Sequence, residues 1–193
     1  MRKTSALAAV VLVTGFGACA ASAQDKSFTD GLTDNWQERS YAQLKLGFAD
    51  LGLSDSAMTL TGTYGLELAH IHPQLSAEAD LLLTLADAES KFSSSMGSTT
   101  VEASVFGMGG YLVGSYDQLP VENLVPYARI GIAYTSAEVK ASNGTASASG
   151  DDSTFGLGLG IGARYSLNEQ FGVLAEFNST EYDVWNVGAH YKF

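Results

Sequence analysis

The residues best suited to chemistry in this sequence are charged side chains that alternate with apolar ones. Glu78 and Asp80 alternate with leucine and alanine, and Arg129 and Arg164 occupy similar positions in later segments. Alternate residues of an extended strand point to opposite faces. Such charges are costly in an enclosed interior unless they are paired, so we expect a salt-bridge and hydrogen-bond network, with a gated ion path as the alternative. The predicted members of this lumen charge network are Lys45, Glu67, Glu78, Asp80, Glu102, Arg129, Arg164, Glu176 and Lys192.

Other groups with chemical potential are weaker candidates. His70 and His72 fall in a predicted turn and have no obvious third ligand for a metal. The glycine-rich segment 158–163 loosely matches a dinucleotide loop, but it lies within an alternating segment and no helix follows it. We therefore predict no catalytic residue, no metal site and no cofactor.

Eight segments with a period of two must position these charges. The fourth is the least regular; there we expect Tyr111 and the odd-numbered residues from Val101 to Val113 to lie with the apolar rows, and Glu102 to lie on the polar side. Long connections rich in Ser, Gly, Ala and Asp alternate with short turns, and the long ones include 86–99 and 136–153. The eight segments are 40–49, 58–69, 75–85, 100–114, 125–135, 154–166, 170–178 and 183–193.

The polar rows indicate which face of such a sheet points outward. In 154–166 the polar face is a row of glycines, which suits a narrow interior better than a solvated exterior. Phe155 and Tyr165 are ten residues apart on the apolar face. At about 3.3 Å per residue and a tilt of about 40°, they span about 25 Å of height, the thickness of a membrane apolar band. The alternative is a lipocalin-like soluble barrel with the faces reversed.

The amino terminus predicts export. Residues 1–23 have a basic start, an apolar run and a small-residue cleavage site, so we read them as a cleaved signal peptide that contains the sole cysteine, Cys19. We predict that residues 24–38 are a polar periplasmic lead-in and that 39–193 form the barrel domain. Without Arg2 and Lys3 the chain has 8 basic and 21 acidic residues, a formal net charge of −13. This balance argues against nucleic acid as a partner, because phosphate binding needs a basic patch.

The last residues carry a resemblance to a known family. Asn186, Gly188, Tyr191 and Phe193 match the carboxy-terminal assembly signal of outer-membrane β-barrels. Over about residues 39–193 the chain resembles the small OmpA/OmpX-like outer membrane protein β-barrel family. The resemblance implies an all-β fold: an eight-stranded antiparallel transmembrane β-barrel with an up-and-down meander, located in the cell outer membrane of a Gram-negative bacterium and related to porins.

What this resemblance implies for function is less specific. The expected role is structural and surface-interacting, with adhesion or defence through extracellular loops; the alternatives are a narrow channel for small solutes and a lipid-modifying enzyme. The enzyme is disfavoured because the His-x-Ser-Asn motif of lipid A deacylases is missing. Expected partners are outer-membrane lipid, lipopolysaccharide, the barrel-assembly machinery and host or surface ligands. The expected aromatic girdle comprises Phe48, Tyr64, Tyr111, Tyr134, Phe155, Tyr165 and Trp185.

Overall fold

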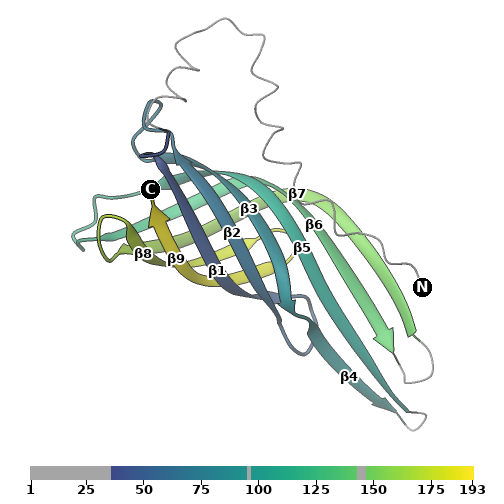
Figure 1. The fold of residues 1–193 in the computed structure, drawn as a ribbon. Helices are drawn as coiled ribbons and strands as arrows, with labels where there is room; N and C mark the ends of the chain where they lie inside the picture. The colour runs from purple at the N-terminus through teal and green to yellow at the C-terminus, as the bar shows by residue number, and fades with distance from the viewer. Residues whose placement is uncertain (1–35, 95–96, 143–146) are drawn as a thin grey trace, which may run out of the picture. The chain divides into compact units, whose positions relative to one another are not determined.

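A computed structural model describes residues 36–94, 97–142 and 147–193, which form one antiparallel β-sheet (Figure 1). The predicted signal peptide and most of the predicted lead-in lie outside these residues. No helix in the described part of the chain is long and apolar enough to cross a bilayer. The strands are β1 (Ser40–Asp50), β2 (Ala57–Glu67), β3 (Leu75–Ala86), β4 (Ala88–Ser94), β5 (Gly97–Ser115), β6 (Leu124–Ser142), β7 (Ser147–Ser166), β8 (Phe171–Ser179) and β9 (Asp183–Lys192).

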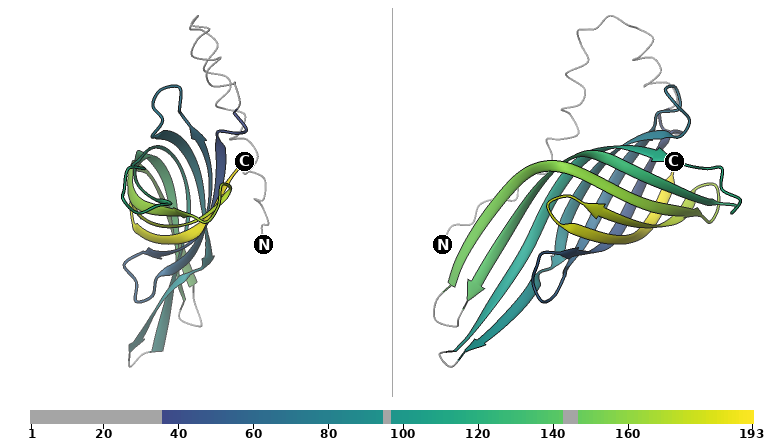
Figure 2. Two further views of the ribbon diagram at one scale, coloured as in Figure 1. Left: turned by 90° about the vertical axis from the view of Figure 1, so that its left-hand side faces the viewer. Right: turned by 180° about the vertical axis from the view of Figure 1, so that it is seen from behind.

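Pairing between β3 and β5 closes this sheet into a barrel. The spatial order is β3-β2-β1-β9-β8-β7-β6-β5-β4, with β3 also bonded to β5. Only Asp87 separates β3 from β4, and both pair with β5, so together they count as one strand of the barrel. The predicted eight-stranded up-and-down antiparallel barrel is thus confirmed, and its closed ring is seen end-on in the left view of Figure 2.

The apolar rows face outward and the polar rows face the lumen. In β1, Leu44, Leu46 and Phe48 are exposed while Lys45 is fully buried. In β7, Phe155 is 77% exposed. A lipocalin-like arrangement would bury these apolar side chains, so the predicted orientation of the faces is correct for most strands.

Strand β5 is the exception, and its prediction was wrong. Val105, Tyr111 and Val113 are buried in the interior, while Leu112 is exposed on the outer wall. Both faces of β5 are rich in apolar residues, so its alternation did not distinguish inside from outside.

The two ends of the barrel differ. We call the end with the connections 68–74, 116–123 and 167–170 the turn end, and the opposite one the loop end. At the loop end, the predicted long loops 86–99 and 136–153 are largely strand, because β4 pairs with β5 and β6 pairs with β7 far beyond the ring. Figure 1 shows these hairpins continuing past the other strands.

Candidate functional site

Five predicted residues meet at the centre of the lumen. Arg129 Nη1 lies 3.1 Å from Glu78 Oε2 and 3.2 Å from Glu176 Oε2, and its Nη2 contacts Asp80. Lys45 Nζ lies 2.7 Å from Glu176 Oε1 and 3.7 Å from Asp80 Oδ2. Lys45, Arg129 and Glu176 have fully buried side chains. Two cations and three carboxylates therefore lie in direct contact where water is largely excluded. We call this group the lumen network.

The network joins strands that are not neighbours in the sheet. Its members come from β1, β3, β6 and β8, and Arg129 and Glu78 are separated by 51 residues in sequence. Such bonds can form only across the lumen, so they tie opposite walls together and fill the space between them. Loss of one partner would leave an unpaired buried charge, which costs about 3–5 kcal/mol.

Neutral side chains complete the bonding of Glu78. The Tyr41 hydroxyl lies 2.8 Å from Glu78 Oε1 and 2.9 Å from Ser76 Oγ. Gln43 Nε2 donates to the same carboxylate over 3.2 Å. The sequence prediction missed these partners because it selected charged residues alone. Tyr41, Gln43 and Ser76 nevertheless lie on the inward side of their strands.

Glu176 and Arg129 have similar support. Tyr127 donates its hydroxyl to Glu176 Oε2 over 2.9 Å, and Asn178 donates to Oε1 over 2.6 Å. The guanidinium carbon of Arg129 lies 3.6 Å from the centre of the Tyr111 ring, a cation–π contact. These uncharged neighbours hold each charged group in one orientation.

Glycines that face the lumen make room for the inward rings. A Cβ on Gly109 or Gly158 would lie within 2.7 Å of Tyr111 side-chain atoms. A Cβ on Gly65 would overlap the ring of Tyr41. The glycine rows in the sequence are therefore the spaces into which the large lumen side chains fit.

The other predicted charged residues lie elsewhere. Lys192 Nζ forms a separate pair with Glu67 Oε1 at 2.7 Å, near the turn end. Arg164 Nη1 lies 3.2 Å from His190 Nδ1, also at the turn end. Glu102 does not belong to the lumen at all: it is exposed on the part of β5 that runs beyond the ring, opposite Lys140. Its inward placement was wrong because the face of β5 was assigned in reverse.

The expected aromatic girdle is only partly placed as predicted. Tyr111 is 9% exposed and points inward, so its inclusion was wrong for the same reason as that of Glu102. Tyr134 is half-buried and packs on Phe155 with ring centres 4.9 Å apart. The remaining members are exposed on the outer wall: Phe48, Tyr64, Phe155, Tyr165 and Trp185.

The carboxy-terminal residues complete the last strand. Tyr191 packs against Phe171 with ring centres 4.9 Å apart and meets Phe193 edge-on at 5.2 Å. Asn186 is buried and Gly188 lies over the backbone of β1. The role of Asn186, Gly188, Tyr191 and Phe193 as an assembly signal stays a prediction.

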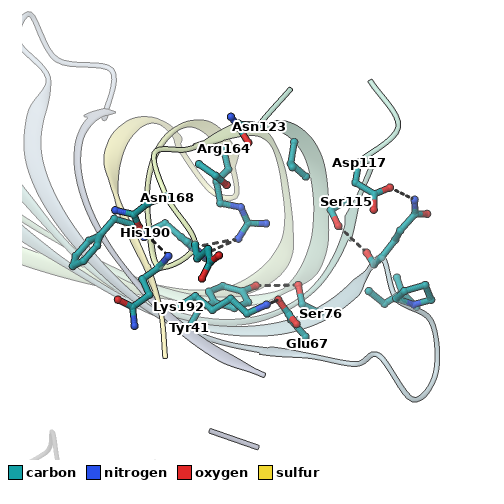
Figure 3. A pocket seen from close by; sticks show the side chains of 18 residues that line it. Tyr41, Glu67, Ser76, Ser115, Asp117, Asn123, Arg164, Asn168, His190 and Lys192 are labelled. Carbon is teal, nitrogen blue, oxygen red and sulfur yellow. Dashed lines mark hydrogen bonds and ion pairs between the residues drawn. The ribbon is translucent and has the colours of Figure 1, made fainter. Parts of the chain in front are cut away.

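Two cavities lie on either side of the lumen network. The larger has a volume of about 540 Å³ and opens at the turn end, where Arg164, His190 and Lys192 line it (Figure 3). The smaller, of about 40 Å³, lies on the loop side and is lined by residues that include Asp80 and Tyr182.

The strands that leave the ring at the loop end form a second surface. From Ser147 to Ser153 every residue of β7 is exposed, whereas Gly158 and Gly160 deeper in the strand are buried. Strand β8 reaches β7 only at Leu159, which pairs with Ser179. The first twelve residues of β7 therefore have one unpaired edge. We call the sheet made by residues 88–94, 97–104, 136–142 and 147–153 the projecting sheet.

Comparison with known proteins agrees with this architecture. The sequence profile of the outer membrane protein beta-barrel domain matches residues 9–193. The chain belongs to this family. It is an outer-membrane β-barrel protein. No curated protein sequence matches the chain.

Several solved structures share the fold. A major outer membrane protein from Thermus thermophilus has a TM-score of 0.55 and 11% identity, covering 80% of this chain and 99% of its own. Ail, the attachment invasion locus protein of Yersinia pestis, has a TM-score of 0.50 and 15% identity, covering 80% and 96%. Ail in complex with the heparin analogue sucrose octasulfate gives a TM-score of 0.51, 15% identity and the same coverage. At such low identities the likeness concerns the fold alone.

Proposed function

We propose that this protein is a surface-interaction protein of the outer membrane whose projecting sheet binds extended polypeptide segments, in adhesion or in defence. The observation that carries the proposal is the loss of alternation along β7, where Ser147–Ser153 is exposed on both faces and one edge is unpaired. An unpaired edge offers backbone donors and acceptors to an incoming strand. The rigid barrel below holds that edge in place.

The charge of the projecting sheet indicates the kind of partner. It carries two basic residues against five acidic ones, a net charge of −3; the charged residues are Lys91, Lys140, Glu89, Glu102, Glu138, Asp151 and Asp152. A polyanion such as the heparin analogue bound by Ail would be repelled by this surface. The partner that fits is therefore basic or neutral.

A shortened hairpin tests the proposal. Residues 138–151 are replaced by Asn-Gly, which closes β6 and β7 with a two-residue turn above the Ala137–Asp152 pair. Cells producing the wild type should attach to immobilised basic polypeptides, and cells producing the shortened form should lose that attachment. Heat-modifiable electrophoretic mobility checks that the barrel still folds, and Glu169→Gln at the turn end is the matched control. Equal attachment by both forms would contradict the proposal.

A narrow channel is the other function that sequence reasoning left open. The lumen network occupies the centre of the barrel, and eight strands leave an interior just wide enough for side chains. We therefore expect no steady conductance in planar bilayers. Steady openings that disappear when Arg129 is replaced would favour the channel instead.

A further inference from the structure

The turn-end cavity contains a cation that is not paired with a carboxylate. Arg164 contacts the His190 imidazole, and its guanidinium carbon lies 5.4 Å from the centre of the Tyr41 ring and 5.8 Å from that of Tyr127. Within the described residues, no carboxylate lies at ion-pair distance from it. Figure 3 shows its guanidinium pointing into the cavity.

The other cations that point into the barrel are neutralised. Lys45 and Arg129 pair with carboxylates of the lumen network, and Lys192 pairs with Glu67 over 2.7 Å. Arg164 therefore retains hydrogen-bond donors that its neighbours do not use. A guanidinium presents a planar fork of donors that matches the two oxygens of a carboxylate.

The rim of the same cavity has the opposite charge. Asp117 and Glu169 are exposed on two different turns, and both line the opening. Asp117 accepts a hydrogen bond of 2.8 Å from Gln74 Nε2, which leaves its carboxylate charge uncompensated. Asn168 and Gln170, on the same exposed turn as Glu169, add amide groups to the lining of the cavity. A cation inside and carboxylates at the rim fit a ligand that is negative at one end and positive at the other.

The size and the closed floor of the cavity limit the ligand further. Its volume of about 540 Å³ suits a small molecule, since ligand pockets are typically about 300–1,000 Å³. The hydroxyl of Tyr41 and the lumen network close the inner side, so a ligand would bind there without passing through.

We propose that the turn-end cavity binds a short zwitterionic peptide, whose terminal carboxylate pairs with Arg164 and whose amino group lies toward Asp117 and Glu169. This site is separate from the projecting sheet and lies at the other end of the barrel.

NMR titration of the isotope-labelled, folded full chain in detergent micelles tests the site directly. The probe is dialanine, and the signals followed are the side-chain amides of Asn168 and Gln170, with the backbone amide of Gly150 as a remote control. Dialanine amide lacks the carboxylate, and N-acetyl-dialanine lacks the ammonium group. Arg164→Gln removes the cation of the cavity that has no carboxylate partner among the described residues, whereas Lys140→Gln makes the same charge change at the loop end, where the lysine is half exposed.

The expected result is saturable shifts of the turn-end signals with dialanine. Both modified probes should bind more weakly, Arg164→Gln should lower the affinity by about tenfold or more, and Lys140→Gln should leave it unchanged. Absence of saturable shifts, or full binding by Arg164→Gln, would overturn the proposal. Equal binding of N-acetyl-dialanine would also overturn it, since the site would then recognise carboxylates alone. The comparison of the three probes on the wild type is decisive even if Arg164→Gln fails to fold.

Discussion

Replacing Lys45 tests whether the lumen network holds the barrel together. Lys45 is fully buried, and its ammonium lies 2.7 Å from Glu176 and 3.7 Å from Asp80. In Lys45→Met three buried carboxylates face the single cation of Arg129. Because an uncompensated buried charge remains, we expect the free energy of unfolding to fall by about 3–5 kcal/mol.

The same logic predicts a rescue. Adding Glu176→Gln to Lys45→Met removes one of the excess carboxylates and should recover a large part of the loss, since the two residues are directly bonded. The control is Lys140→Met, because Lys140 pairs with Glu138 at 3.3 Å and both side chains are about half exposed; it should change the stability by less than about 1 kcal/mol. Urea unfolding in lipid vesicles, followed by tryptophan fluorescence, measures five proteins: the wild type, Lys45→Met, Glu176→Gln alone, the double variant and the control. A loss below about 1 kcal/mol for Lys45→Met, or strictly additive effects in the double variant, would refute a coupled buried network.

Three further predictions concern the wall and the end of the chain. Gly65→Val should impair folding by about 1–3 kcal/mol or more, because its side chain would overlap an inward tyrosine ring, while Gly62→Val on the same strand has free space and should be tolerated; the heat-modifiable fraction on gels measures both. Ile161→Arg should cost about 2–4 kcal/mol in vesicle unfolding if that face meets lipid, whereas Ser149→Arg on the projecting sheet should be nearly neutral. Deleting Phe193 should lower the amount of folded barrel recovered in outer-membrane fractions, and an unchanged amount would argue against the assembly signal.

Most of the architecture follows from the alternation in single strands. In β1 and β7 apolar residues stand opposite Lys, Gln or Gly, so each strand shows which side faces lipid. Strand β5 carries Val105 and Val113 on one face and Phe106 and Leu112 on the other, so its orientation depends on its partners. The Tyr111 ring fits inward because glycines on β5 and β7 leave space for it.

Predicting which inward charges meet would have required the register of all the strands in the barrel. The sequence predicted that Lys45, Glu78, Asp80, Arg129 and Glu176 all lie on the inward side of their strands. Alternation within a strand does not show how far along the barrel axis each residue lies. Glu67 also lies on the inward side of its strand, yet it is near the turn end and pairs with Lys192. The sequence also did not predict how far the strands extend beyond the ring, because Ser, Ala and Gly are typical of loops. These segments are strands because β6 and β7 pair with each other there.

Site-specific labelling on intact cells tests the central proposal, that the projecting sheet stands at the cell surface. The only cysteine of the sequence, Cys19, lies in the predicted signal peptide, so single substitutions report their own positions. Ser149 on the projecting sheet and Glu169 at the turn end both have exposed side chains. Each is replaced by cysteine in a separate variant, and the cells are treated with a membrane-impermeant maleimide. The account predicts that Ser149→Cys reacts on intact cells and that Glu169→Cys reacts only after the outer membrane is opened. The reverse pattern would contradict it, since the projecting sheet would then face the periplasm.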